Sequence, residues 1–93
     1  VAYVRQAGHF TYTGEYAEAR RAGEQALSLY RRAGDRAGEA QALRELGFLH
    51  WSAEDYGTAL SYGRDALQLH RRLGDVEGEA TALHNLAEIY RSL

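Results

Sequence analysis

The chain repeats itself with a period of 40 residues. When residues 14–53 are aligned with residues 54–93, 17 of the 40 pairs are identical. The longest agreement is the pattern Arg-Arg-x-Gly-Asp-x-x-Gly-Glu-Ala, which begins at Arg31 and again at Arg71. A fixed period of roughly 20–50 residues is typical of stacked-repeat proteins, in which each unit buries its apolar face against the next. Such units usually present a surface to a partner and rarely carry out chemistry.

Length and composition exclude several classes of protein. Ninety-three residues allow one domain, and an apolar fraction of 45% is normal for a folded chain. The net charge of −2 gives no reason to expect nucleic acid as a partner. No apolar run approaches the roughly 20 residues that span a bilayer, and no signal peptide is visible. We therefore expect a cytoplasmic protein that binds neither nucleic acid nor membrane.

All 11 basic residues are arginine. Together with abundant Ala and Gly, this usage indicates a source with GC-rich codons, and we expect an actinobacterium. The chain begins at Val1 and contains no methionine. We therefore expect it to be a piece of a larger protein.

The spacing of apolar residues predicts helices throughout, with no alternating strand pattern. Over residues 15–33, small and apolar residues recur at spacings of three and four, and charged residues occupy the opposite face. Gly34 stands where a glycine ends a helix, and Asp35 where an N-cap begins the next; Gly74 and Asp75 repeat this signal. The predicted single domain, residues 1–93, has helices at about 2–12, 15–33, 36–52, 55–73 and 76–92.

Gly23 and Gly63 occupy equivalent places in the middle of two predicted helices. Each costs roughly 1 kcal/mol relative to alanine in a helix interior. Their repetition predicts close contact between helices at these points, and chance in a glycine-rich sequence is the alternative. The helix over residues 2–12 is the weakest copy, because Gln6 stands where the others have Leu46 and Leu86.

The pattern resembles the tetratricopeptide repeat family. The residues that carry the resemblance are Leu46-Gly47, His50, Tyr56, Ala59 and Ala66-Leu67, with partial copies at Tyr16, Ala19, Ala26-Leu27, Leu86-Ala87 and Tyr90. The resemblance implies an all-α fold of five helices, with antiparallel helix hairpins stacked as a right-handed α-solenoid. The 40-residue period, longer than the common 34, is similar to repeats of large bacterial signalling proteins and transcriptional regulators.

In the resembled family, the first helix of each pair lines a concave groove that holds a peptide or a partner helix. The family's groove positions fall on Gln41, Arg44, Phe48, Trp51, Ser52, Thr81, His84, Glu88 and Arg91, and on Val4, Thr11 and Tyr12 of the first predicted helix. We therefore expect a protein-interaction module. The alternative is a structural spacer or oligomerisation segment without an external ligand.

Phe48 and Trp51 lie three residues apart and outside the predicted core stripe. They are either a binding hot spot or structural, with Trp51 packed over a neighbouring turn or against Tyr12. Arg44, His84 and Arg91 either line the groove for an acidic peptide or form part of a mixed, solvated face. The glutamates that favour the second interpretation are Glu45, Glu79 and Glu88.

Nothing in the sequence supports catalysis, a metal or a cofactor. No two of the four histidines are three or four residues apart, and there is no cysteine. No serine lies in a nucleophile elbow, and no glycine-rich phosphate loop follows a strand.

The last predicted helix has no partner after it. It carries Leu83, Leu86, Ile89 and Tyr90. Since terminal repeats need a cap, we expect these residues either to pack on residues 55–73 or to recruit a second copy of the chain, and the second outcome is favoured.

Overall fold

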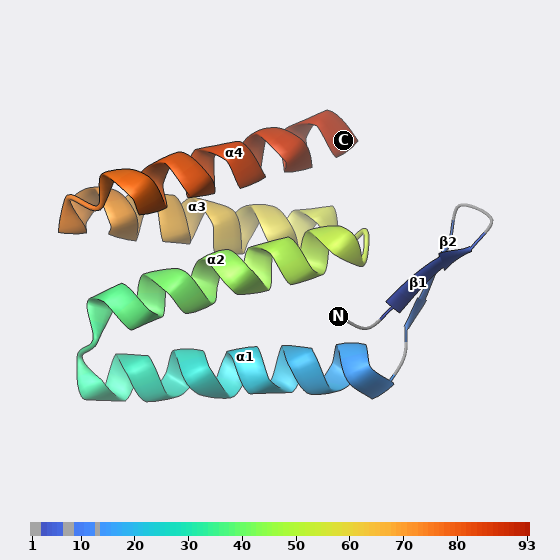
Figure 1. Ribbon diagram of the computed structural model, residues 1–93, viewed down its shortest axis with the longest axis horizontal. Coiled ribbons are helices and arrows are strands. Elements are labelled where there is room, and N and C mark those ends of the chain that lie inside the picture. Colours follow the sequence, from blue (N-terminus) through green and yellow to red (C-terminus); the bar gives the residue numbers. More distant parts are fainter. Residues whose placement is uncertain (1–2, 7–8, 13) are drawn as a thin grey trace.

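The computed structural model describes the backbone of residues 3–6, 9–12 and 14–93, and the side chains from Tyr16 onward. Within these residues the chain forms one two-stranded sheet and four α-helices. The elements are β1 (Tyr3–Gln6), β2 (His9–Tyr12), α1 (Gly14–Ala33), α2 (Arg36–Ser52), α3 (Tyr56–Leu73) and α4 (Val76–Ser92). Sequential helices run antiparallel and lie side by side in order, and the strands project beyond one end (Figure 1).

The helical repeat predicted from the sequence is confirmed, with helix bounds that differ by at most one residue from the predicted 15–33, 36–52, 55–73 and 76–92. By the 40-residue shift, α1 is equivalent to α3, and α2 is equivalent to α4. In Figure 1, α2 and α4 therefore run in the same direction, with α3 returning between them.

The predicted helix over residues 2–12 is wrong, so the described residues hold four helices and not five. β1 and β2 pair antiparallel there, with Tyr3 opposite Tyr12 and Gln6 opposite His9. The physical reason is local composition. Val4, Phe10 and Thr11, like the tyrosines, are β-branched or aromatic residues that favour strands. An isolated helix of this length is also marginal without tertiary packing.

The predicted turn signals operate as expected. Gly34 and Gly74 adopt φ of 70° and 67°, the left-handed conformation that ends a helix. The Asp35 side chain then accepts a hydrogen bond from the Gly38 N–H at 3.0 Å, and Asp75 is the equivalent N-cap of α4. Two of the three helix-to-helix turns therefore have the same construction.

The close helix contact predicted at the mid-helix glycines is confirmed. A Cβ added to Gly23 would lie 2.7 Å from Leu46 Cδ2, and one added to Gly63 would lie 2.9 Å from Leu86 Cδ2. Gly23 of α1 thus makes room for Leu46 of α2, and Gly63 of α3 makes room for the equivalent Leu86 of α4. A Cβ on Gly47 would lie 3.3 Å from the backbone nitrogen of Gly63, so α2 and α3 also approach closely.

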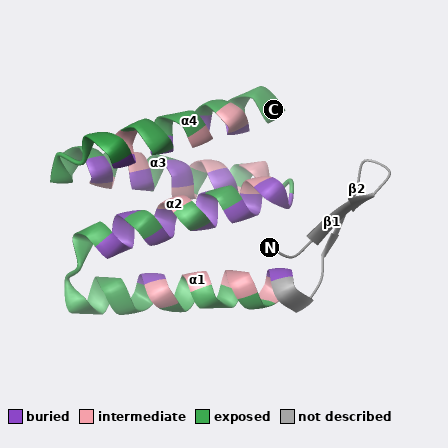
Figure 2. Ribbon diagram, in the orientation of Figure 1, coloured by how far each residue is buried: buried purple, intermediate pink, exposed green. Residues whose placement is uncertain are grey.

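The core lies between neighbouring helices. One cluster joins α1, α2 and α3 through Leu27, Ala42, Leu43, Leu46 and Ala66. Another joins α3 and α4 through Ala59, Leu86 and Ile89, with Trp51 of α2 packed against it. Figure 2 shows burial on the sides where helices face each other. Among the described residues, no helix has the length and apolar character needed to cross a membrane.

Candidate functional site

Two hollows lie between α2 and α4, and we call the side of the two helices that holds them the α2/α4 groove. Its residues recur every three or four positions along each helix, which places them on one side of that helix. One hollow lies towards each end of the helices. The aromatic hollow, of about 320 Å³, is lined by Phe48, Trp51, His84, Asn85, Glu88 and Ile89. The polar hollow, of about 310 Å³, includes Gln41, Arg44, His70, Asp75, Glu77 and Thr81.

The structure therefore brings together seven of the residues predicted for the groove. Phe48, Trp51, His84 and Glu88 meet at the aromatic hollow. Gln41, Arg44 and Thr81 meet at the polar hollow.

The aromatic hollow has one exposed and one half-buried ring. The Phe48 side chain is 49% exposed. Its ring centroid lies 5.5 Å from that of Trp51, with the planes tilted by 41°. Trp51 packs on the α3–α4 core cluster, and its Nε1–H donates to Ser92 Oγ at 2.8 Å. Trp51 thus joins α2 to α4 and also lines the hollow, whereas Phe48 is the aromatic side chain available to a ligand.

The charged groups beside the aromatic hollow are paired with one another. The Arg91 guanidinium donates a hydrogen bond to the Glu88 carboxylate. His84 Nε2 lies 3.8 Å from the same carboxylate. Arg91 and His84 therefore form a mixed face with Glu88 at this end of the groove.

The polar hollow contains a chain of side chains that links three helices. His70 of α3 is buried, and its Nε2 lies 3.3 Å from Arg44 Nη1. Since arginine has only donors, Nε2 accepts, which leaves the Nδ1–H to donate to Asp75 Oδ2 at 3.1 Å. The Gly78 N–H, and secondarily His70, hold the pKa of Asp75 below its ordinary value. These contacts of His70 with Arg44 and Asp75 hold the Arg44 side chain at the groove.

Sequence reasoning missed His70 and Asp75 as groove residues, although a signal was present. A histidine precedes the N-cap aspartate by five residues in two turns, at His70–Asp75 and at His50–Asp55. In the second pair His50 Nδ1 lies 3.5 Å from Asp55 Oδ2. The recurrence of this spacing indicates a histidine that docks on the following turn.

The remaining predicted groove residues lie elsewhere. Ser52 is buried at the end of α2. Val4 belongs to β1, and Thr11 and Tyr12 belong to β2. Their side chains lie outside the described part of the structure, so packing of Trp51 on Tyr12 stays a prediction.

The four residues predicted for self-association divide between two sides of α4. Leu86 and Ile89 are buried against α3. Leu83 and Tyr90 are largely exposed, and the Tyr90 hydroxyl accepts a hydrogen bond from Arg64 Nη2 at 2.8 Å. Only Leu83 and Tyr90 are open to a second copy.

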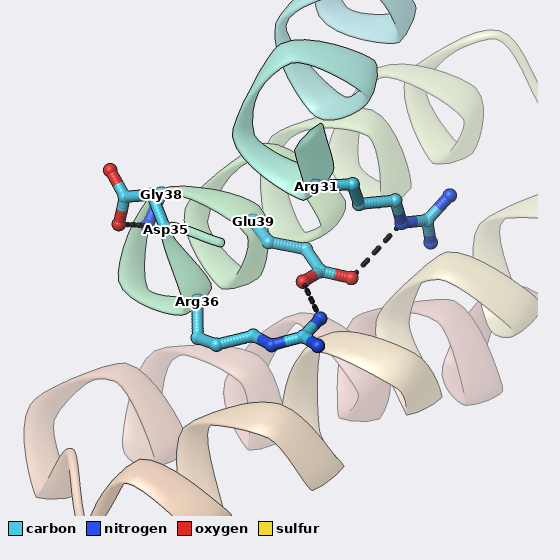
Figure 3. A network of polar contacts seen from close by, with 5 residues as sticks. All are labelled: Arg31, Asp35, Arg36, Gly38 and Glu39. Carbon is cyan, nitrogen blue, oxygen red and sulfur yellow. Dashed lines mark hydrogen bonds and ion pairs between the residues drawn. The ribbon is translucent and has the colours of Figure 1, made fainter. Parts of the chain in front are cut away.

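A third hollow, of about 470 Å³, lies where α1, α2 and α3 meet, and it includes Arg31, Arg36 and Glu39. In Figure 3, both arginines point to the Glu39 carboxylate, with N–O distances of 3.0 Å for Arg31 and 2.7 Å for Arg36. Burial raises the pKa of Glu39, but hydrogen bonds from Arg36 and Arg31 outweigh it, so the pKa lies below the ordinary value. These ion pairs join the end of α1 to the start of α2.

The second turn of this kind repeats the contact. Arg71 Nε donates to Glu79 Oε2 at 2.8 Å, as Arg31 Nε does to Glu39. Arg31 and Arg71, the first arginine of each repeated pair, therefore form ion pairs across the turns. The 40-residue repetition of both partners was the signal that could have predicted these pairs.

The described side chains offer no group of three or more His, Cys, Asp or Glu residues able to hold a metal ion. The two hollows thus offer hydrogen-bonding groups, paired charges and aromatic side chains, which suit non-covalent binding.

Comparison with known protein families gives a match. A family model described as tetratricopeptide repeat matches residues 1–72. The match extends from the strands through nearly all of α3. α4 lies beyond it and is related to α2 by the internal repeat. A comparison with curated proteins gives no match.

Proposed function

Because the chain belongs to the tetratricopeptide repeat family, we propose that the α2/α4 groove binds a segment of a partner protein. Members of this family generally mediate protein–protein interactions, and the family is a repeat scaffold and not a class of enzymes. The observation that carries the proposal is the position of the aromatic and polar hollows along one groove between repeat-equivalent helices.

The aromatic hollow accepts one apolar side chain of the ligand against Phe48, Trp51 and Ile89. The polar hollow orients the ligand backbone through Gln41, Arg44 and Thr81. Trp51 is held by Ser92, and Arg44 by His70, so both walls are ordered before binding. Preorganised side chains lose less conformational entropy on binding, which allows a short segment to bind with few anchors.

The test is a peptide-display selection against the chain, followed by affinity measurements on enriched peptides. We expect Phe48→Ala to weaken binding by at least about tenfold, because it removes the exposed wall of the aromatic hollow. Leu73→Ala is the matched control, since Leu73 is a similarly exposed apolar residue outside the groove. Trp51→Ala is less suitable, because Trp51 also packs on the core.

Two results would overturn the groove proposal. One is the absence of any enriched peptide. The other is equal affinity of enriched peptides for wild type and Phe48→Ala, with Leu73→Ala unchanged. Helical melting curves of all three proteins establish that the variants remain folded.

A second candidate function is that of a structural or oligomerisation segment. The observation that favours it is the exposure of Leu83, at 44%, and of Tyr90, at 50%. A place within a larger bacterial regulator, and in the cytoplasm, stays a prediction of the sequence. Nucleic acid and membranes are not proposed as partners, because the net charge is −2.

A further inference from the structure

α4 exposes a side that its repeat equivalent α2 keeps buried. In α2, Leu43 is 2% exposed and His50 is 7% exposed. α3 covers this side, since Tyr62, Ala66 and Leu69 pack with Leu43 in one cluster and the Tyr62 ring stacks on His50. The equivalent residues of α4 are Leu83, which is 44% exposed, and Tyr90, which is 50% exposed. With Ala87, the exposed equivalent of Gly47, they form what we call the α4 outer face.

α1 exposes the matching side of its own equivalent, α3. The residues of α3 that pack in one cluster with α2 include Tyr62, Ala66 and Leu69. Their equivalents in α1 are Ala22, which is exposed, Ala26, which is half-buried, and Leu29, which is 60% exposed. We call these three residues the α1 outer face. Figure 2 shows that both α1 and α4 are exposed on the sides facing away from the stack.

The two outer faces are equivalent, by the 40-residue repeat, to the two sides of the α2–α3 contact within the chain. α2 and α3 form the most extensive helix contact of the fold. Because α4 is equivalent to α2 and α1 to α3, an α1 helix placed on α4 would repeat that contact. We propose that a second copy of this chain stacks head to tail on the first, with its α1 outer face on the α4 outer face.

The side chains at the new contact are compatible with this geometry. Within the chain, His50 stacks on Tyr62, with ring centroids 5.4 Å apart. Between copies, Tyr90 meets Ala22 at the same place, so a larger ring faces a smaller residue. Leu83 would lie beside Ala26 and Leu29, as Leu43 shares one cluster with Ala66 and Leu69 within the chain.

In the proposed contact, the backbones of α4 and of the second copy's α1 lie slightly farther apart than those of α2 and α3. A Cβ on Gly47 would lie 3.3 Å from the Gly63 nitrogen and 3.4 Å from the Ala59 oxygen. Ala87 carries that Cβ and would face Gly23 and Ala19 of the second copy. The two helices therefore separate by a few tenths of an ångström relative to α2 and α3. Ala22, smaller than its equivalent Tyr62, leaves room for this adjustment.

The proposed contact joins two different faces, so it leaves one α1 and one α4 outer face open at the ends of each assembly. Assemblies therefore grow with concentration and have no fixed stoichiometry. This inference extends the second candidate function and does not depend on the ligand of the α2/α4 groove.

The experiment is sedimentation analysis of the chain from micromolar to millimolar concentration. We expect wild type to form a series of species that increases with concentration. Leu83→Arg on α4 and Leu29→Arg on α1 should each be monomeric, because each has one outer face blocked. An equimolar mixture of the two variants should form a 1:1 heterodimer and nothing larger, since each variant retains the face that the other lacks.

Matched controls lie on the same helices outside the two faces. Val76→Arg on α4 and Gln25→Arg on α1 introduce the same charge at exposed positions and should assemble like wild type. Thermal unfolding followed by circular dichroism checks that each variant is folded. All four changes replace side chains exposed in the single chain, so we expect similar melting temperatures.

Three outcomes would overturn the proposal. A wild type that is monomeric at every concentration would also remove oligomerisation from the second candidate function. If Leu29→Arg alone still forms a dimer, α4 of one copy pairs with α4 of the other. That result contradicts head-to-tail stacking, although the chain still self-associates. A mixture of the two variants that stays monomeric contradicts the pairing of α1 with α4.

Discussion

At the scale of single residues, glycines in the first turns of α2 and α4 make room for rings from the preceding helix. An added Cβ at Gly38 would overlap the Tyr30 ring. At the equivalent Gly78 it would overlap the His70 ring and the Asp75 carboxylate. The ring at the end of one helix can therefore lie over the start of the next only because these positions lack a side chain.

Gly78→Ala should destabilise the fold, because the buried His70 ring cannot move without losing its contacts with Arg44 and Asp75. Overpacking and loss of the cap predict a decrease of about 1–3 kcal/mol in the free energy of unfolding. Gly57→Ala is the matched control, since its added Cβ meets nothing within 4 Å among the described residues. It should raise the free energy of unfolding by up to about 1 kcal/mol.

Urea unfolding followed by circular dichroism measures both changes. Equal stability of Gly78→Ala and wild type would show that the His70 ring can leave its site at no cost.

At the scale of elements, ion pairs join helices across the two glycine turns. Arg31 of α1 and Arg36 of α2 share the buried Glu39 carboxylate. At the next turn, Arg71 of α3 contacts Glu79 of α4, which is more exposed. Since solvent weakens exposed ion pairs, the first junction should contribute more to stability than the second.

The Glu39 junction should make stability depend on pH in the acid range. Its pKa lies below the ordinary 4.5 in the folded chain, because hydrogen bonds from Arg36 and Arg31 outweigh the effect of burial. The unfolded chain therefore takes up the proton first as the pH falls. The stabilisation is fully present above about pH 4.5 and is lost as the pH falls through the folded pKa.

Glu39→Gln tests this dependence. We expect the difference in unfolding free energy between wild type and Glu39→Gln to be constant near neutral pH and to shrink below about pH 4.5. Glu79→Gln, at the equivalent and more exposed position, should cost less at neutral pH. A wild-type advantage that is unchanged in acid would contradict the assignment to Glu39.

At the scale of the whole molecule, the helices form a single stack with extents of 41 × 27 × 18 Å for the described residues. α2 has neighbours on two sides, α1 and α3, and α3 has α2 and α4. α1 and α4 each expose an outer face. In such an array each helix depends on its immediate neighbours, so local stability should be highest in the middle.

Hydrogen exchange followed by mass spectrometry should therefore show the slowest amide exchange in α2 and α3 and faster exchange in α1 and α4. The measurement is made at low concentration, where copies do not associate. Exchange in α4 as slow as in α3 under these conditions would contradict the nearest-neighbour picture. Slowing confined to the outer sides of α1 and α4 at high concentration would agree with head-to-tail stacking.

Much of the fold was predictable because its signals are local. Gly34, Asp35, Gly74 and Asp75 mark helix ends through their own backbone and capping chemistry. The paired strands at residues 3–6 and 9–12 were missed because the 40-residue alignment transferred a helical pattern to residues that favour strands. A helix in this segment would have little tertiary packing to stabilise it, so the strand preference of its residues determines the structure.

The candidate site was predictable to the extent that the repeat determines which side of a helix a residue occupies. Phe48, Trp51, His84 and Glu88 were predicted from that periodicity and do meet at one hollow. His70 and Asp75 could not be placed at the groove in this way, because they come from α3 and the turn before α4. Residues from a third helix become neighbours only when the helices pack.

The sequence by itself determined the repeat, the four helices and the turns between them, because helix periodicity and capping act over a few residues. Only the tertiary structure decided which apolar residues of α4 are buried. Leu86 packs on Gly63 of α3 and is buried. Leu83 lies on the other side of α4, and it is exposed, although α3 covers the equivalent side of α2. Burial depends on the presence of a neighbouring helix, and equivalent sequence positions differ wherever that neighbour differs.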